Sequence, residues 1–117
     1  MPRKSLSSAK VFYPRFSRDE LVALLQERLY AVSPSLPIKR AVLFGSWATG
    51  RATAFSDIDL LVVYVGPPRK DAYELVRKAI ALRGLEPHVY DEVGAQRVAP
   101  TIERMTRGGV VLDTRAD

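Results

Sequence analysis

Apolar residues recur at helical spacing near the start of the chain and predict a first helix. The letters SRDE at 17–20 form a capping-box pattern, in which the serine and the glutamate bond each other's backbone amides. The apolar positions that follow are Leu21, Leu24, Leu25 and Leu29. Because they share one helical face, we expect a helix over 17–30, ended by the stretch SPSLP at 33–37.

Two continuous apolar segments predict buried strands on either side of a glycine turn. The first, IKRAVLFG at 38–45, ends in glycine, and the second, SDIDLLVVYV at 56–65, is followed by a Gly-Pro-Pro turn. Between them, the Gly45-Ser46 step leads into WATG, which is long enough for one helical turn. We expect a hairpin-like connection that returns the second strand beside the first.

The second half of the chain alternates helix and strand patterns. It predicts a helix over 69–83, a strand over 85–91, a helix over 94–107 and a last short strand at 108–113. Pro87 places its strand at a sheet edge or at a bulge, because proline has no N–H to donate. This order indicates an α/β (α+β) fold, with a mixed sheet of about four strands and helices packed on one face.

Composition limits the domain organisation and the environment. The 117 residues fit one domain, expected over 17–113, with a basic N-terminal arm at 1–16 and a tail at 114–117. Since there are no cysteines, disulfides and thiolate metal sites are excluded. No signal peptide or membrane-spanning apolar segment is evident, so we expect a cytoplasmic protein without a membrane partner. A net charge of +5 favours polyanionic partners.

Two aspartates at the start of the second apolar strand are the first sign of chemistry. Residues two apart in a strand point to the same face, so Asp57 and Asp59 project together while Ile58 points away. Two like charges this close repel each other, and a divalent cation between them relieves the repulsion. Paired aspartates on a strand therefore indicate a Mg²⁺ site.

The glycine turn before the aspartates suits a phosphate chain. Free backbone N–H groups at the Gly45-Ser46 step, with no Cβ at the glycine, make an anion site to which the Ser46 hydroxyl can add a donor. A phosphate site next to a carboxylate-bound metal is what phosphoryl or nucleotidyl transfer requires, because positioning and charge neutralisation do most of the catalysis.

These residues also resemble a known family. The stretch GSWATGRATAFSDIDLLVV at 45–63 is similar to the G-S-x-A-x-G and S-D-x-D-L-x-V signature of the DNA polymerase beta nucleotidyltransferase superfamily. It resembles the minimal nucleotidyltransferase branch, whose members are often paired with HEPN-domain proteins. The positions in register are Gly45, Ser46, Ala48, Gly50, Ser56, Asp57, Asp59 and Leu60.

The resemblance implies a fold, a reaction and a site. It implies two Mg²⁺ ions held by three carboxylates, and an NTP, with ATP the expected donor, whose nucleoside monophosphate passes to an acceptor hydroxyl. The acceptor it suggests is a tyrosine of a HEPN-type toxin, which would make this chain an antitoxin. Gly45, Ser46 and Ser56 would bind the nucleotide. Many relatives carry arginine where this chain has Thr49, and we expect Arg51 to substitute for it.

The third carboxylate of the family lies on a neighbouring strand. Glu86 is the best candidate, and it could bind metal and accept the proton of the attacking hydroxyl. Asp91 and Glu92 are alternatives, because a strand slipped or bulged at Pro87 would present Asp91 instead. The catalytic and metal-binding set is therefore Asp57, Asp59 and Glu86, with the identity of the third member left open.

Three other functions fit parts of the pattern. The chain could be an antitoxin that acts by occlusion, with a vestigial nucleotide site. It could be a small-molecule nucleotidyltransferase of the aminoglycoside-modifying kind, which would need a further domain or a homo-oligomer to enclose its acceptor. The basic arm at 1–16 could contact nucleic acid, although its only aromatic residues are Phe12, Tyr13 and Phe16.

Overall fold

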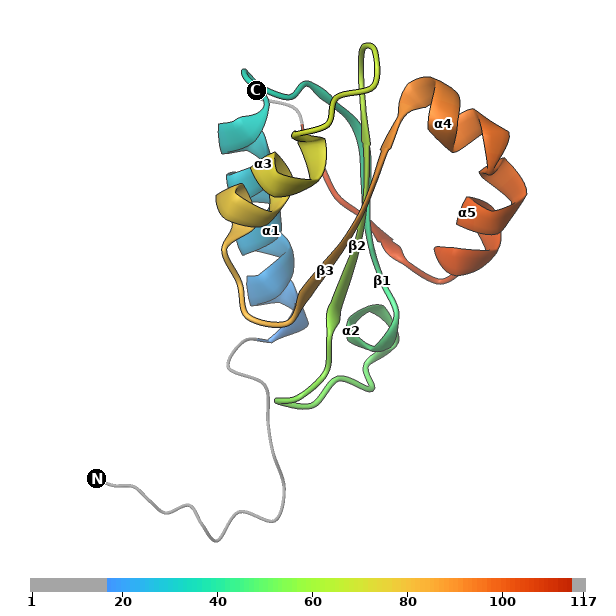
Figure 1. Cartoon of the computed structure of the whole chain (residues 1–117). Coiled ribbons are helices and arrows are strands. Elements are labelled where there is room, and N and C mark those ends of the chain that lie inside the picture. Colours follow the sequence, from blue (N-terminus) through green and yellow to red (C-terminus); the bar gives the residue numbers. More distant parts are fainter. Residues whose placement is uncertain (1–16, 115–117) are drawn as a thin grey trace, which may run out of the picture.

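A computed structural model of the chain describes residues 17–114, which form a four-stranded sheet with helices on both sides (Figure 1). The elements are, in chain order, α1 (Arg18–Val32), β1 (Ile38–Phe44), α2 (Ser46–Thr49), β2 (Ile58–Tyr64), α3 (Ala72–Ile80), β3 (Leu85–Asp91), α4 (Glu92–Arg97), α5 (Ala99–Met105) and β4 (Val110–Val111). The basic arm and the last three residues of the predicted tail lie outside the described residues.

The sheet is mixed, as the sequence predicts. Its strand order is β3-β2-β1-β4, in which β1 pairs antiparallel with β2 and with β4, while β2 pairs parallel with β3. The antiparallel pairing of β1 and β2 confirms the hairpin-like connection. The parallel pairing requires a crossover, which α3 supplies. β3 is an edge strand, in agreement with the expectation from Pro87.

Helices α1 and α3 cover one face of the sheet. The predicted capping box begins α1, since the Glu20 amide donates to Ser17 Oγ at 3.1 Å and the Ser17 amide donates to Glu20 Oε1 at 2.8 Å. The helix continues to Val32, two residues beyond the predicted end. Its buried leucines pack with the apolar side of β1 and β2 and with α3 in the main core.

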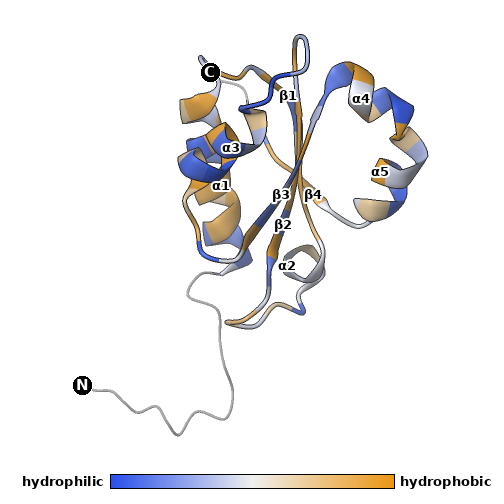
Figure 2. Ribbon diagram, in the orientation of Figure 1, coloured by the Kyte–Doolittle hydropathy of each residue, from blue (hydrophilic) through white to orange (hydrophobic). Residues whose placement is uncertain are grey.

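The other face of the sheet is also covered, so the expectation of helices on one face is wrong in this detail. Helices α4 and α5 lie across that face (Figure 1), and Ile102 packs there against Val42, Phe44, Leu61 and Val63. The reason is that β1 and β2 are apolar on both sides and need cover on both. Figure 2 shows these two apolar strands between the two helical layers.

Two predicted helices have different bounds in the structure. The helix predicted over 69–83 is shorter, Ala72–Ile80, and ends at Ala81, which takes the left-handed conformation with φ of 52°. The single helix predicted over 94–107 is two helices that meet at Val98, where φ and ψ of −116° and 26° break the helical path. Within residues 17–114, no helix is both long and apolar enough to cross a membrane.

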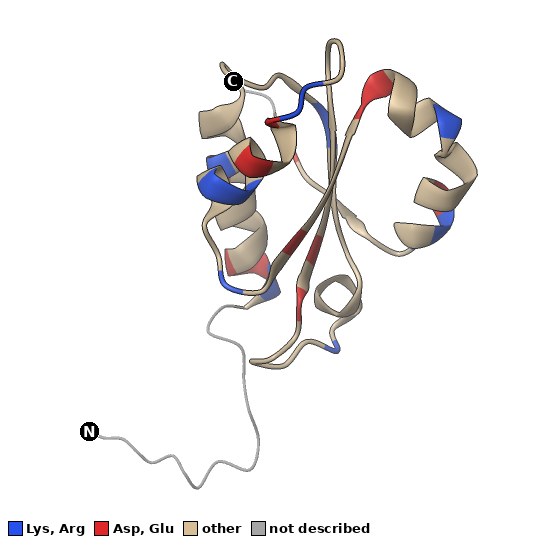
Figure 3. Ribbon diagram, viewed as in Figure 1, with Lys and Arg blue, Asp and Glu red and all other residues tan. Residues whose placement is uncertain are grey.

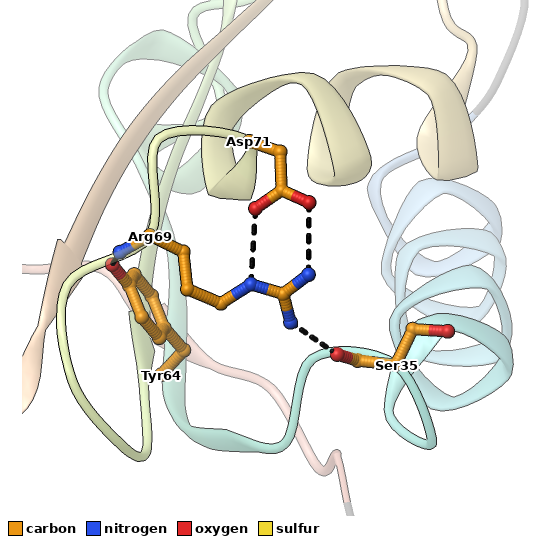
Figure 4. A network of polar contacts seen from close by, with 4 residues as sticks. All are labelled: Ser35, Tyr64, Arg69 and Asp71. Atoms are coloured by element: carbon orange, nitrogen blue, oxygen red, sulfur yellow. Dashed lines mark hydrogen bonds and ion pairs between the residues drawn. The ribbon is translucent and has the colours of Figure 1, made fainter.

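A polar network explains why α3 begins later than predicted (Figure 4). The Arg69 guanidinium donates to both carboxylate oxygens of Asp71, at 3.0 and 2.8 Å, and to the Ser35 carbonyl at 2.6 Å. The Arg69 amide donates to the Tyr64 hydroxyl at 2.8 Å. These bonds hold Arg69 in the β2–α3 connection. The hydrogen bonds from Arg69 lower the pKa of Asp71, and Asp71 in turn raises the pKa of Arg69.

Candidate active site

The glycine turn after β1 has a backbone that few residues other than glycine adopt. Gly45 has φ of 78° and ψ of −152°, and its carbonyl accepts the amides of Ala48 and Thr49 at 3.1 and 3.2 Å. These bonds close the single turn of α2. The amides of Ser46 and Trp47 then have no acceptor inside the helix, as at any helix start. The sequence-predicted helical turn is confirmed, and its first two N–H groups are donors suited to an anion.

Trp47 fixes α2 to the main core. The residue is only 6% exposed and belongs to the cluster formed by α1, α3 and the sheet. The indole Nε1 is buried without a hydrogen-bond partner in the described part of the chain. The side chain therefore holds the turn in place by apolar packing.

The aspartate at the start of β2 packs directly on this glycine. Asp59 is the register partner of Phe44, the residue that precedes Gly45. A Cβ on Gly45 would lie 2.5 Å from Asp59 Oδ2, which is too close for a non-bonded contact. Only glycine leaves room for the carboxylate here. The phosphate-type turn and the aspartate, 14 positions apart in sequence, are neighbours in space.

Glu86 stands beside Asp59 on the neighbouring strand. The two are paired in the parallel ladder of β2 and β3, where register partners project to the same face. Figure 3 shows these acidic segments side by side on the two strands, close to α2. The structure thus brings together Asp59 and Glu86, from two of the three carboxylate positions that the sequence suggests.

The two alternatives for the third carboxylate lie elsewhere. Asp91 pairs with Tyr64, five residues further along β2 and therefore about 16 Å from Asp59 along the strand. Its carboxylate caps α4 by accepting the Gly94 amide at 3.2 Å. Glu92 forms an ion pair with Lys39 at 2.7 Å. The β3 register therefore places Glu86, and neither alternative, next to the aspartates.

Asp57 lies just before β2 and is exposed. Its backbone rests against the turn that leads into β3, because a Cβ on Gly84 would lie 4.0 Å from the Asp57 Cα. Among residues 17–114, no three His, Asp or Glu side chains converge as a ready-made metal site. The donor chemistry nevertheless fits Mg²⁺, since Asp57, Asp59 and Glu86 offer the hard carboxylate oxygens that this ion prefers.

His88 borders the acidic pair on the side of α4 and α5. Its Nε2 is 3.8 Å from Asp59 Oδ1, and its ring centroid is 5.2 Å from that of Phe44. About a third of the histidine side chain is exposed. His88 therefore forms one wall of the site, between the carboxylates and the second apolar core.

The loop between α2 and β2 carries the remaining predicted residues. Ser56 is part of the loop's own turn, since its hydroxyl oxygen accepts the Thr53 amide at 2.8 Å. Arg51 is exposed, and its amide donates to the Ser46 carbonyl at 2.9 Å, so it lies at the C-terminal end of α2. Phe55 is 75% exposed at the tip of this loop. Arg51 is thus joined to the turn through its backbone, whereas the contacts of the Ser56 hydroxyl stay within the loop.

Sequence reasoning missed a second arginine at the same turn. The Nη1 of Arg18, the first residue of α1, donates to the Ala48 carbonyl at 2.9 Å. These residues are 30 positions apart, and no local sequence pattern signals the contact. The capping box at Ser17 was the only available clue, because it fixes where the helix and its first side chain begin.

A pocket of about 470 Å³ lies away from these residues. It opens between α4, α5 and the start of β1, next to the Lys39 and Glu92 ion pair. The start of β1 is the opposite end of the sheet from Gly45, because β1 runs towards the glycine turn. The candidate site lies at the other end of the sheet and is distinct from this pocket.

Comparison with known proteins agrees with the geometry. A comparison with curated proteins gives no significant match. A solved structure from Sulfolobus solfataricus, described as a candidate nucleotidyltransferase, is similar with a TM-score of 0.56 and 25% identity, over 81% of each chain. The family model of the nucleotidyltransferase domain matches residues 21–113, which include the glycine turn and all three carboxylates. The chain belongs to the nucleotidyltransferase domain family.

Proposed function

We propose that this protein transfers a nucleoside monophosphate from Mg·NTP, with ATP the expected donor, to an acceptor hydroxyl. The observation that carries the proposal is the packing of Asp59 on Gly45, with Glu86 paired beside it. Family membership supports nucleotidyl transfer in general, and proteins of this family generally use a nucleoside triphosphate and a divalent metal. The donor, the metal and the acceptor are the parts that we propose.

Asp57, Asp59 and Glu86 would hold two Mg²⁺ ions. When bound, these ions would neutralise phosphate charge and polarise the α-phosphate. The Gly45 turn would bind the β- and γ-phosphates through the amides of Ser46 and Trp47, because these amides have no acceptor inside α2. The Ser46 hydroxyl would add a further donor. Arg51 and Ser56 would contact the nucleotide from the α2–β2 loop.

Glu86 is also placed to accept a proton. It is exposed at the sheet edge, so an acceptor can approach it from solvent, while its register partner Asp59 faces the phosphate turn. A carboxylate in this position would take the proton of the attacking hydroxyl as the bond to the α-phosphate forms and pyrophosphate leaves. The acceptor hydroxyl would thus be bound at the β3 side of the site.

The acceptor that we propose is a tyrosine of a HEPN-type toxin, which would make the chain an antitoxin. The exposure of Asp57 and Glu86 supports a macromolecular acceptor, because a large partner can reach both carboxylates from solvent. A small-molecule acceptor would need to be enclosed by a second copy of the chain. A strictly monomeric protein in solution would count against that version.

Transfer of label from α-³²P ATP tests the reaction. The full chain is incubated with and without Mg²⁺, alone and with the product of the neighbouring gene, and label on protein is followed. We expect Mg²⁺-dependent label on the partner that disappears in the Asp57→Asn/Asp59→Asn variant. The matched control is Asp71→Asn, which removes an exposed carboxylate at the other end of the sheet and should leave transfer intact. Full transfer by the double variant would refute the proposed site.

A non-catalytic antitoxin is the second candidate. It is favoured by the lack of three converging metal-binding side chains within 17–114, and by the neutral Thr49 in the phosphate turn. In that case the double aspartate variant would still neutralise the partner in a growth assay, and partner binding would be independent of ATP. Loss of neutralisation in the double variant, with partner binding retained, would exclude it.

A further inference from the structure

The guanidinium of Arg18 is held at the phosphate turn by only one of its donors. The capping box fixes the residue at the first position of α1, and Nη1 donates to the Ala48 carbonyl at 2.9 Å. The guanidinium forms no ion pair with a carboxylate of residues 17–114, and no other hydrogen bond joins it to them. Since a guanidinium carries five N–H groups, most of them remain free to bind an anion.

The turn itself supplies no charge. The Thr49 hydroxyl is used locally, at 3.3 and 3.4 Å from the carbonyls of Gly45 and Ser46. Helix α2 has four residues and is therefore only about 6 Å long. The Ala48 carbonyl lies at the C-terminal end of α2, about one helical turn from the amides of Ser46 and Trp47, so a phosphate chain bound at these amides meets Arg18 by extending along α2.

We propose that Arg18 binds the triphosphate of the nucleotide, supplying from α1 the positive charge that the turn lacks. This inference rests on the proposed nucleotidyltransferase function. The Ala48 carbonyl orients the planar guanidinium through Nη1, and Nε and Nη2 bind non-bridging phosphate oxygens. Arg18 and Arg51 then flank α2, and both contribute to charge neutralisation of the triphosphate.

A second arginine of the same helix provides a matched control. The Nη1 of Arg28 donates to the Ile80 carbonyl at the end of α3, so Arg28 also joins α1 to a helix-end carbonyl. It lies ten residues, about 15 Å, along α1 from Arg18 and is remote from the phosphate turn. If both arginines have a purely structural role, replacing either one should change the affinity for Mg·ATP equally.

The test is calorimetric titration of the full chain with Mg·ATP and with Mg·AMP. We expect Arg18→Gln to weaken Mg·ATP binding about tenfold and to reduce its dependence on salt, with little change for Mg·AMP. Arg28→Gln should leave both affinities unchanged. Arg18→Lys keeps the charge but loses the planar fork, so it should weaken Mg·ATP binding two- to threefold. Melting temperatures of all variants report the structural contribution separately.

The possible outcomes separate this inference from the proposed function. Equal Mg·ATP affinities for Arg18→Gln and Arg28→Gln, with transfer intact, would overturn the inference and leave the function standing. An effect of Arg18→Gln on binding in a protein that transfers no label would support the inference and refute catalysis. A wild-type chain that does not bind Mg·ATP would overturn both. If Arg18→Gln does not fold, the same comparison is made between Arg18→Lys and Arg28→Lys.

Discussion

At the end of the sheet where β2 ends and β1 begins, oppositely charged side chains form ion pairs. At the other end, most charged side chains have no ion-pair partner among residues 17–114. Lys39 pairs with Glu92 at 2.7 Å, and Arg69 donates to both carboxylate oxygens of Asp71. At the opposite end, Asp59 and its register partner Glu86 lie beside the Gly45 turn, Asp57 lies just before β2, and Arg18 and Arg51 lie at the C-terminal end of α2. Within residues 17–114, the ion-pair contacts of these five groups are limited to that of Asp59 Oδ1 with His88 Nε2, at 3.8 Å.

From this difference we infer that one end is adapted to folding and the other to binding. Exposed ion pairs add little stability, but they leave no charge in need of a partner. Grouped like charges oppose folding and are retained where a ligand of opposite charge compensates for them. We infer that the carboxylates bind cations and that the arginines bind phosphate. Four predictions test this contrast, from the largest expected effect to the smallest.

The largest effect is expected at Gly45, against which the Asp59 carboxylate packs. Gly45→Ala forces a Cβ into Asp59 Oδ2 and into a backbone conformation that alanine rarely adopts, so we expect a loss of about 3 kcal/mol in unfolding free energy. Nucleotide transfer should fall at least a hundredfold. Urea unfolding and the label assay measure the two effects.

Gly50 is the matched control for that substitution. It also has a positive φ, of 80°, but a Cβ there would meet no atom within 4 Å. Gly50→Ala should therefore cost only about 1 kcal/mol, the penalty for the left-handed conformation. Equal losses for the two variants would show that the contact between Gly45 and Asp59 has no energetic importance.

The second prediction concerns Mg²⁺ and stability. Bound Mg²⁺ should stabilise the wild-type chain by about 2.7 kcal/mol at a hundred times its dissociation constant, because the unfolded chain lacks the site. Asp57→Asn/Asp59→Asn should abolish this stabilisation and should itself melt higher than the wild type without Mg²⁺, since like charges are removed. Thermal melts with MgCl₂ and with NaCl of equal ionic strength give both results. A Mg²⁺ response that survives in the double variant would place the metal elsewhere.

The third prediction concerns backbone strain outside the candidate site, at the end of α3. Ala81 ends α3 with a positive φ of 52°, a position at which glycine is preferred. Ala81→Gly should add about 0.5 to 1 kcal/mol of stability without changing transfer. Ala79→Gly, inside the same helix, should instead cost about 1 kcal/mol. Destabilisation by both substitutions would show that the Ala81 conformation carries no strain.

The smallest effect is expected from the paired end. The Arg69 hydrogen bonds lower the pKa of Asp71 below its usual value near 3.8. A lowered carboxyl pKa contributes stability at neutral pH, and this contribution is lost as the pH falls through the lowered value. Asp71→Asn should therefore destabilise the chain slightly at pH 7 and less at pH 2. Paired urea unfolding curves at the two pH values test this, and a difference that grows in acid would contradict it.

Local patterns were sufficient to predict most of the fold. The start of α1 follows from the Ser17 capping box, and the β1 and β2 bounds follow from apolar segments that end at glycine and proline turns. The second helical layer was missed, although Val42 and Leu43 gave a signal, since adjacent apolar strand residues imply cover on both faces. The early start expected for α3 was wrong because Arg69 is held outside the helix by its bonds, one of them to the Ser35 carbonyl, 34 positions away in sequence.

In the candidate site too, some residues could be predicted from local patterns, whereas others depend on how distant segments pack. The two-residue spacing in a strand supplied Asp57 and Asp59, the turn before them supplied Gly45 and Ser46, and the family resemblance implied a third carboxylate. The choice of Glu86 over Asp91 needed the β3 register, which a sequence with a central proline leaves ambiguous. Arg18 could not be predicted at all, because its contact with the turn depends on how α1 packs against the sheet.

The position of β3 at the sheet edge also bears on solubility. An edge strand presents unpaired backbone groups and can recruit another chain into intermolecular β-pairing. Pro87 removes one donor from this edge, and the exposed charge of Glu86 precedes it directly. On the other edge, β4 is only two residues long. The residue proposed to accept the catalytic proton thus also helps to keep the protein from aggregating through its open edge.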